Sequence, residues 1–244
     1  MFLPRLEMSS VTSPLPQCAS PTGTPAEPKD AAQKPSSDGV MRIADVVVAA
    51  ILFAATLPLV VLAAVLVRLT SSGSAIYTQK RVGRGGREFT IYKLRTMRHR
   101  CEAESGVRWA TRNDPRVTPV GRFLRASHLD ELPQLWNVLR GDMSLIGPRP
   151  ERPEIVVELR DQIPHYDDRH AVRPGVTGLA QIQLPPDSSI ASVTRKLELD
   201  RAYIAERGVW LDVRILVGTV LHLACVPHPR IRRVLRLPAG RGPG

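Results

Sequence analysis

Cysteine is scarce in this chain of 244 residues, and the three cysteines that are present lie far apart. Cys18, Cys101 and Cys225 show neither the spacing of a metal site nor the even number of a disulfide framework. A disulfide-stapled secreted domain is therefore not indicated, and a reducing compartment is the simpler expectation.

Aromatic residues make up only 5% of the chain, which argues against a base-stacking platform for single-stranded nucleic acid. The first 39 residues also lack the apolar core and the cleavage site of a secretory signal, so export is not indicated. What the chain has in excess is positive charge. Its 34 Lys and Arg residues against 23 Asp and Glu residues give +11, which indicates an anionic partner. That partner could be nucleic acid, an acidic membrane face or a phosphorylated substrate.

Residues 1–39 are rich in Pro, Ser, Thr and Ala and have no helical or strand periodicity, so we expect a disordered tail. Residues 46–67, "VVVAAILFAATLPLVVLAAVLV", then run for 22 residues without a charge. As a straight helix this run would be about 33 Å long, which is enough to cross a bilayer. Pro58 lies just past its middle, however, and neither half alone is long enough to span.

Two topologies are compatible with this run: a kinked spanning helix, or a helix hairpin over residues 40–70 that enters and leaves on one face. The flank after the run carries a large excess of Lys and Arg, which predicts that the downstream domain lies in the cytoplasm. The flank before it has Lys34 and Arg42 against Asp38 and Asp45, which leaves the N-terminal side undecided.

The remaining pattern predicts a mainly helical α+β domain over residues 71–226. Residues 75–97 indicate two strands around the turn "GRGG", which lacks the spacing of a phosphate-binding loop. Residues 119–126 form a short basic-amphipathic piece. Helices are expected after Asp130, over about 190–206 and over about 210–226. Residues 227–244 are basic with interleaved apolar residues and are predicted to be a tail, either solvated or lying on an anionic membrane surface.

The stretch "HLDELPQLWNVLRGD" places two adjacent carboxylates, Asp130 and Glu131, among leucines. Adjacent residues inside a helix point about 100° apart, so a pair that serves one site is better placed at a helix start. Pro133 supports that placement because proline is tolerated in the first turn, and it makes Asp130 a candidate N-cap. The same acids also have a purely structural interpretation, since they satisfy free N–H groups and the helix dipole.

Basic residues beside turns and element ends favour a chemical role for this dyad. They are Lys93, Arg125, Arg149 and Arg173. Arginine presents a planar fork suited to phosphate oxygens, although each residue alone could be an ordinary surface charge. A carboxylate pair with several cations in a membrane-attached domain indicates phosphoryl transfer. A carboxylate can bind Mg²⁺ beside a diphosphate, or attack phosphorus to form an acyl phosphate.

Three long motifs carry a resemblance to a known family: "QKRVGRGGREFTIYKLRTM", "TRNDPRVTPVGRFLRASHLDELPQLWNVLRGDMSLIGPRPERP" and "RHAVRPGVTGLAQI". Over about residues 40–222 the chain resembles the bacterial sugar transferases, monotopic phosphoglycosyl transferases that start glycan assembly on a polyprenyl carrier. It departs from the family at Ser74, where proline is usual. The resemblance implies a membrane-associated domain with a Pro-broken re-entrant helix and a small β-hairpin, on the cytoplasmic face of the inner membrane. With a polar tail in place of additional spanning helices, a minimal architecture is expected.

By this resemblance Asp130 would be the nucleophile and would also help to hold Mg²⁺, the expected cofactor. It would attack the β-phosphorus of a UDP-sugar, expel UMP and carry the phosphosugar until a polyprenyl (undecaprenyl) phosphate takes it. Glu131 would assist as a proton acceptor or by positioning groups. The substrate phosphates would be bound by Lys93, Arg125, Arg149 and Arg173. The product would initiate an exopolysaccharide, capsule, O-antigen or glycoprotein glycan, and the sequence names neither the sugar nor the oligomeric state.

Two other functions are compatible with the residues alone. A membrane-tethered basic module that binds nucleic acid or acidic lipid would explain the charge, but no recognised nucleic-acid motif is present. A hydrolase could use the same dyad to cleave nucleotide sugars with water as the acceptor.

Overall fold

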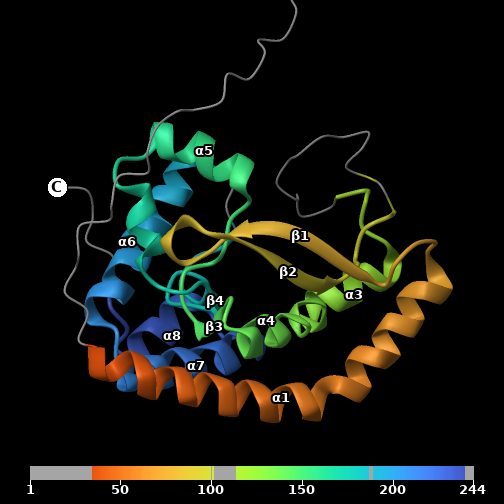
Figure 1. Ribbon diagram of the computed structural model, residues 1–244, viewed down its shortest axis with the longest axis horizontal. Helices are drawn as coiled ribbons and strands as arrows, with labels where there is room; N and C mark the ends of the chain where they lie inside the picture. The colour runs from red at the N-terminus through yellow and green to blue at the C-terminus, as the bar shows by residue number, and fades with distance from the viewer. Residues whose placement is uncertain (1–34, 100, 102–113, 187–188, 240–244) are drawn as a thin grey trace, which may run out of the picture.

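The computed structural model describes residues 35–99, 101, 114–186 and 189–239. Residues 1–34 of the tail predicted over residues 1–39 lie outside the described residues. The described part is mainly helical with one two-stranded antiparallel sheet and one pair of short parallel strands (Figure 1). This confirms the predicted mainly helical α+β fold with a small β-hairpin. The described helices are α1 (Pro35–Thr70), α3 (Pro119–Ala126), α4 (Gln134–Arg140), α5 (Pro153–Gln162), α6 (Ile190–Glu206), α7 (Val209–Leu223) and α8 (His228–Val234). The described strands are β1 (Ile76–Val82), β2 (Glu88–Leu94), β3 (Ser144–Ile146) and β4 (Gly175–Thr177).

Helix α1 is long and apolar enough, by length and composition, to cross a membrane between Asp38 and Thr70. Pro58 does not end it: helix continues on both sides, and α1 curves along one edge of the molecule (Figure 1). The predicted break is thus a bend, because proline removes a single helical hydrogen bond and neighbouring turns keep theirs.

Both halves of α1 pack against the same globular part of the chain. In the first half, Ala49 is buried in the main core. In the second half, Ala63 and Val67 are buried against Leu94 of β2 and Leu124 of α3. The outward side of the helix is a continuous row of exposed Val, Leu and Ile side chains. The helix therefore lies along the domain with one apolar face left uncovered.

Two charged side chains tie the start of α1 to this domain. Arg42 donates hydrogen bonds to the carbonyl oxygens of Val138 (2.8 Å) and Leu139 (3.1 Å) in the last turn of α4. Asp45 accepts hydrogen bonds from Ser144 Oγ (2.7 Å) and the Leu145 N–H (3.1 Å) in β3. These contacts satisfy the charges that the sequence places at the beginning of the apolar run.

Strands β1 and β2 form the predicted hairpin, with Lys93 opposite Tyr77. The connection needs its glycines, because Gly85 and Gly86 have φ values of +65° and +75°. β2 runs above α4 in Figure 1, and the two elements are in contact. The hairpin thus delivers Lys93 to the segment that carries the carboxylate dyad.

The parallel pair β3–β4, which the sequence did not predict, joins two loops by hydrogen bonds between their main chains. The Gly147 N–H donates to the Thr177 carbonyl, and the Gly175 N–H donates to the Pro148 carbonyl, each at 2.9 Å. A Cβ atom at Gly147 would collide with the Arg173 carbonyl oxygen, and one at Gly175 would collide with the Gly147 nitrogen. The chain around Arg149 is therefore held against the chain around Arg173.

The main core surrounds these strands and receives buried apolar side chains from α1, α4, α6, α7 and α8. Over the described residues 227–239, helix α8 corrects the prediction that residues 227–244 are a tail. Ile231 has an exposed fraction of 0% and Leu237 of 6%, and both belong to the main core. The interleaved apolar residues are the buried face of a short helix, and Gln183 Nε2 donates to the Pro238 carbonyl at 3.0 Å.

Candidate active site

The carboxylate dyad lies on a single 3₁₀ turn, Leu129–Glu131, that leads into α4. His128, with φ of +56°, turns the chain and begins this element. The sequence made Asp130 a candidate N-cap of α4, and the structure corrects this. The chain already coils in the turn Leu129–Glu131, and Pro133 occupies the capping position of α4. The change of direction still sends the two adjacent carboxylates into different surroundings.

Glu131 is engaged by two cations from distant segments. Its Oε1 atom lies 2.8 Å from Lys93 Nζ on β2 and 2.6 Å from Arg149 Nη2. The exposed fractions of the Lys93 and Glu131 side chains are both 16%, whereas that of Arg149 is 41%. Two charge-assisted hydrogen bonds therefore hold Glu131 in a half-buried ion cluster that water reaches from the Arg149 side.

The charges of this cluster set the pKa values of its members. Burial alone would raise the pKa of Glu131, but the positive charges and hydrogen bonds of Arg149 and Lys93 hold it well below its usual range. Burial lowers the pKa of Lys93, and the negative charge of Glu131 offsets part of that effect. Glu131 is thus a fixed anion at neutral pH.

Asp130 has the opposite character. Within the described part of the chain its carboxylate has no hydrogen bond and no ion pair. Burial raises its pKa, and the negative charge of Glu131 raises it further, against the positive charges of Lys93, Arg125 and Arg149. Asp130 is therefore a carboxylate that faces three cations and is bound by none of them, which leaves its oxygens available for chemistry.

Arg125 reaches the dyad from α3 and is held by Thr96. Its Nε atom donates to Thr96 Oγ1 at 2.8 Å. Thr96 follows β2, and its carbonyl oxygen also accepts a hydrogen bond from the Thr118 N–H at the start of α3. The structure therefore brings together five of the six residues expected from the sequence: Lys93, Arg125, Asp130, Glu131 and Arg149.

Arg173 lies apart from this group. Its Nε atom donates to the Gly141 carbonyl at the end of α4, at 3.2 Å. Burial lowers its pKa, and the charges that act on it next are those of Arg42 and Arg84, with Asp38 opposing them. As the structure stands, Arg173 contacts the C-terminal end of α4 and not the dyad.

Asn137 links the dyad segment to the strand that carries Lys93. Its side chain has an exposed fraction of 0%. Nδ2 donates to the Thr90 carbonyl at 2.7 Å, and Oδ1 accepts from the Tyr92 N–H at 3.1 Å. The sequence reasoning missed this residue, although a polar amide between Leu135 and Val138 is a signal for a buried partner.

A second group that the sequence reasoning missed supports the loop of Arg149. Arg169 Nη2 donates to the Arg149 carbonyl at 2.9 Å and pairs with Asp200 at 2.9 Å. Arg169 Nη1 donates to Tyr166 Oη at 2.7 Å. Burial raises the pKa of Asp200 to about 6, and Arg169 limits the rise. The sequence signal for this group is Asp200 on the apolar face of α6, because a buried carboxylate requires a cation partner.

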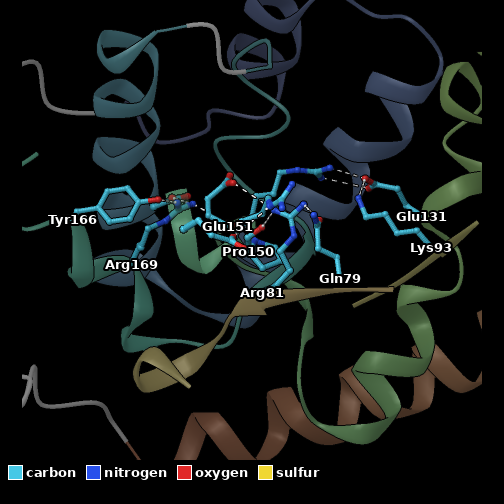
Figure 2. Close-up of polar contacts among 12 residues, drawn as sticks. Gln79, Arg81, Lys93, Glu131, Pro150, Glu151, Tyr166 and Arg169 are labelled. Carbon is cyan, nitrogen blue, oxygen red and sulfur yellow. Dashed lines mark hydrogen bonds and ion pairs between the residues drawn. The ribbon is translucent and has the colours of Figure 1, made fainter. Parts of the chain in front are cut away.

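Figure 2 shows Arg81 and Glu151 between the Tyr166–Arg169 pair and the Glu131–Lys93 pair. Arg81 donates to the Pro150 carbonyl at 3.0 Å and lies 3.5 Å from a Glu151 oxygen. A row of ion pairs thus extends from the dyad into the domain and holds the segment that presents Arg149.

No three His, Cys, Asp or Glu side chains among the described residues are grouped so that they could hold a metal ion by themselves. The Glu131 carboxylate is paired with Lys93 and Arg149, whereas the Asp130 carboxylate has no partner and could bind a metal ion. Mg²⁺ is commonly held by one or two carboxylates together with substrate phosphates. The donor set of this site therefore fits a magnesium ion that shares its ligands with a diphosphate.

Comparison with known proteins gives several similar chains. A UDP-glucose:undecaprenyl-phosphate glucose-1-phosphate transferase of Caulobacter vibrioides is 46% identical over 181 residues, which cover 73% of this chain and 67% of the relative. A UDP-N-acetylgalactosamine-undecaprenyl-phosphate N-acetylgalactosaminephosphotransferase of Aeromonas hydrophila is 42% identical and is matched over 74% of this chain and 43% of its own length. The exopolysaccharide production protein PSS of Rhizobium leguminosarum bv. phaseoli is 37% identical, over 67% of this chain and 84% of the relative.

The chain thus spans about two thirds of the Caulobacter protein and less than half of the Aeromonas protein. The family model described as bacterial sugar transferase matches residues 36–225, which include α1, the hairpin, the dyad turn and α7. That match confirms the resemblance seen in the sequence motifs, and it shows that the chain belongs to the bacterial sugar transferase family.

Proposed function

We propose that this chain transfers a sugar-1-phosphate from a UDP-sugar to a polyprenyl phosphate, releases UMP and thereby initiates an exopolysaccharide or a related glycan. The family and the names of the relatives, which specify UDP-sugars and undecaprenyl phosphate, support the reaction class. The observation that carries the mechanism is the asymmetry of the dyad. Glu131 is bound by two cations, whereas Asp130 faces the same cations unbound.

In the first step, an oxygen of the Asp130 carboxylate attacks the β-phosphorus of the UDP-sugar. A new oxygen–phosphorus bond forms while the bond from the β-phosphorus to the bridging oxygen breaks, and that oxygen leaves with the electron pair as part of UMP. In the second step, an oxygen of the polyprenyl phosphate attacks the same phosphorus. The bond to Asp130 breaks, the carboxylate is restored, and the polyprenyl diphosphate sugar departs.

The cations around the dyad have a defined task in both steps. Lys93, Arg125 and Arg149 stabilise the negative charge on the phosphate oxygens as each displacement proceeds. Mg²⁺, when bound through Asp130 and the diphosphate, would neutralise further charge on the same oxygens.

Glu131 acts by position rather than as a base. A proton acceptor works best when its pKa is near the working pH, and the pKa of Glu131 lies well below even that of an ordinary glutamate. Its two ion pairs instead orient Lys93 and Arg149 beside Asp130. Of the two roles that the sequence left open for Glu131, the geometry supports positioning.

The membrane topology belongs to the same proposal. Both halves of α1 pack on one domain, and the exposed side of the helix is apolar. This supports a re-entrant helix embedded from one face of the inner membrane, with the catalytic domain in the cytoplasm. A lipid phosphate and a soluble nucleotide sugar would then meet at one interface.

The test is to trap the covalent intermediate. The full chain, purified in detergent, is offered UDP-sugars labelled in the sugar, with and without undecaprenyl phosphate, and UMP and protein-bound label are measured. We expect stoichiometric UMP and label on the wild type without acceptor, chase of the label when acceptor is added, and no label on Asp130→Asn. Asp161→Asn, which changes an exposed acid on α5, is the matched control and should label normally.

Full labelling of Asp130→Asn would end the proposed mechanism. Turnover that ignores added undecaprenyl phosphate would instead identify a nucleotide-sugar hydrolase. A panel of UDP-glucose, UDP-galactose and UDP-N-acetylgalactosamine in the same assay names the sugar.

A further inference from the structure

A cavity of about 590 Å³ lies between α6 and α8. Neither Asp130 nor Glu131 is among the residues that line it. Four arginines line it: Arg195 from α6 and Arg232, Arg233 and Arg236 from α8 and the residues after it. Glu198 is the only acid among the lining residues. The cavity is thus strongly positive, and it is separate from the cations that surround Asp130.

The four guanidinium groups are not used by the fold. In the described ranges, which end at residue 239, none of the four side chains has a hydrogen bond or an ion pair, and all four residues are exposed. The buried arginines of this protein, by contrast, are paired, as Arg169 is with Asp200. Four like charges that converge around a single acid repel one another, and a bound anion would relieve that repulsion.

The walls of the cavity also have an apolar part. Leu184, Leu199 and Leu237 line it, and Leu199 and Leu237 are buried in the main core. An apolar floor of low dielectric constant strengthens the field of the arginines above it. It can also contact the uncharged part of a ligand, and cavities of roughly 300–1,000 Å³ are typical for small-molecule sites.

We propose that this cavity binds a phosphate-bearing ligand, with the arginines on the phosphate oxygens and the leucines against the remainder of the molecule. Arginine forks bind carboxylate and phosphate oxygens alike, but four arginines against one acid match the higher negative charge of a phosphate group better than the single charge of a carboxylate. The same chemistry is offered by a soluble nucleotide and by an anionic phospholipid headgroup. The site lies beyond the proposed transfer reaction and does not depend on it.

The experiment uses the full chain in phosphatidylcholine nanodiscs and measures Tm. In one arm UDP or inorganic pyrophosphate is added in excess, and in the other part of the phosphatidylcholine is replaced by phosphatidylglycerol. The double variant Arg232→Gln, Arg236→Gln removes two unpaired charges from the cavity. Arg230→Gln is the matched control, because Arg230 is an exposed arginine of the same helix that does not line the cavity.

A ligand present at about a hundred times its Kd should raise Tm by roughly 5 °C. We expect the double variant to lose that rise or a clear part of it, and Arg230→Gln to keep it. Loss in the nucleotide arm identifies a soluble ligand, and loss only in the phosphatidylglycerol arm identifies a lipid headgroup. Equal rises in all three proteins, or no rise in either arm, would overturn the proposal. Asp130→Asn should keep the cavity-dependent rise even if the proposed transfer mechanism fails.

Discussion

Asp130 and Glu131 are neighbours in the chain, yet Glu131 pairs with two of the three nearby cations, Lys93 and Arg149, and Asp130 pairs with none. The same two positive charges hold the pKa of Glu131 down, while burial and the charge of Glu131 hold the pKa of Asp130 up. Adjacent residues thereby become a permanent anion and an unpaired carboxylate of raised pKa. The first two predictions test this division.

The first prediction concerns the pH dependence of UMP release. In the proposed mechanism only ionised Asp130 can attack phosphorus, and the pKa of Asp130 is raised. The rate should therefore fall, as pH decreases, at a higher pH than for an ordinary aspartate. Arg125→Gln removes a positive charge that lowers this pKa, so the acidic limb of kcat/KM should move to still higher pH. Arg122→Gln, an exposed neighbour on α3, should leave the limb in place. An unmoved limb in Arg125→Gln would contradict the electrostatic assignment.

The second prediction concerns the stability that Glu131 contributes. Glu131→Gln leaves Lys93 and Arg149 without their counter-charge, and we expect a loss of about 2–4 kcal/mol in the free energy of unfolding. The value lies toward the lower end of losses for broken buried pairs because Arg149 is 41% exposed. Chemical unfolding in detergent measures it, with Glu206→Gln as an exposed control.

The pH dependence of that loss has a definite sign. The folded-state pKa of Glu131 is depressed, so its contribution is present above the unfolded pKa of about 4.3 and disappears as pH falls through the folded value. The difference between wild type and Glu131→Gln should hence be constant near neutral pH and shrink only in acid. A difference that is largest in acid would refute the assignment.

The third prediction concerns Asn137. Replacement by alanine leaves the Thr90 carbonyl and the Tyr92 N–H without their side-chain partner, and each unsatisfied group costs about 1–3 kcal/mol. We expect Asn137→Ala to lower the free energy of unfolding by about 2–4 kcal/mol. Gln162→Ala, which removes an exposed amide, should change it by less than about 0.5 kcal/mol. Equal effects of the two substitutions would show that Asn137 does not join α4 to β2 as described.

The fourth prediction concerns magnesium. Removal of divalent cations with a chelator should abolish UMP release, and Mg²⁺ should restore it, if Asp130 and the diphosphate share the ion. Binding of Mn²⁺ in the presence of UDP, followed by electron paramagnetic resonance, separates binding from turnover. We expect Asp130→Asn to weaken it at least about tenfold and Asp161→Asn to leave it unchanged. Full activity in chelator would refute a magnesium requirement.

The fifth prediction concerns the two ends of α1. In a chain whose three cysteines are replaced by serine, Gly39→Cys and Ser72→Cys place one thiol beside each end of the apolar segment. A re-entrant helix predicts that a membrane-impermeant maleimide labels both thiols in inverted vesicles and neither in intact cells. Labelling of the two positions from opposite sides would establish a spanning helix.

Local patterns in the sequence were sufficient for much of this architecture. The hairpin followed from two runs of strand residues around "GRGG", and α6 begins and ends at the residues expected from its periodicity. The dyad with Lys93, Arg125 and Arg149 came from long motifs, and the structure places those residues together. Helix boundaries and motif residues depend on short stretches of sequence, and they can therefore be predicted from the sequence alone.

The features that were missed depend on contacts between segments far apart in the chain. Arg149 and Arg173 are each followed by proline in a loop that contains glycine, yet Arg173 contacts Gly141 and Arg149 contacts Glu131. The sequence pattern does not predict helix α8, because its few apolar residues gain a buried face only when α6 and α7 provide a surface for Ile231. The 3₁₀ turn of the dyad depends on the left-handed conformation of His128, which is uncommon for residues other than glycine and which no pattern in the sequence indicates.

The backbone contact between Gly147 and Gly175 bears on how this enzyme family could be re-engineered. The stretch that presents Arg149 and the stretch that starts at Arg173 leave no room between them even for one methyl group. A graft of only one of the two from a relative with a different donor would therefore set two unmatched main chains against each other. Any graft of these segments from a relative should therefore exchange residues 144–151 and 172–178 together.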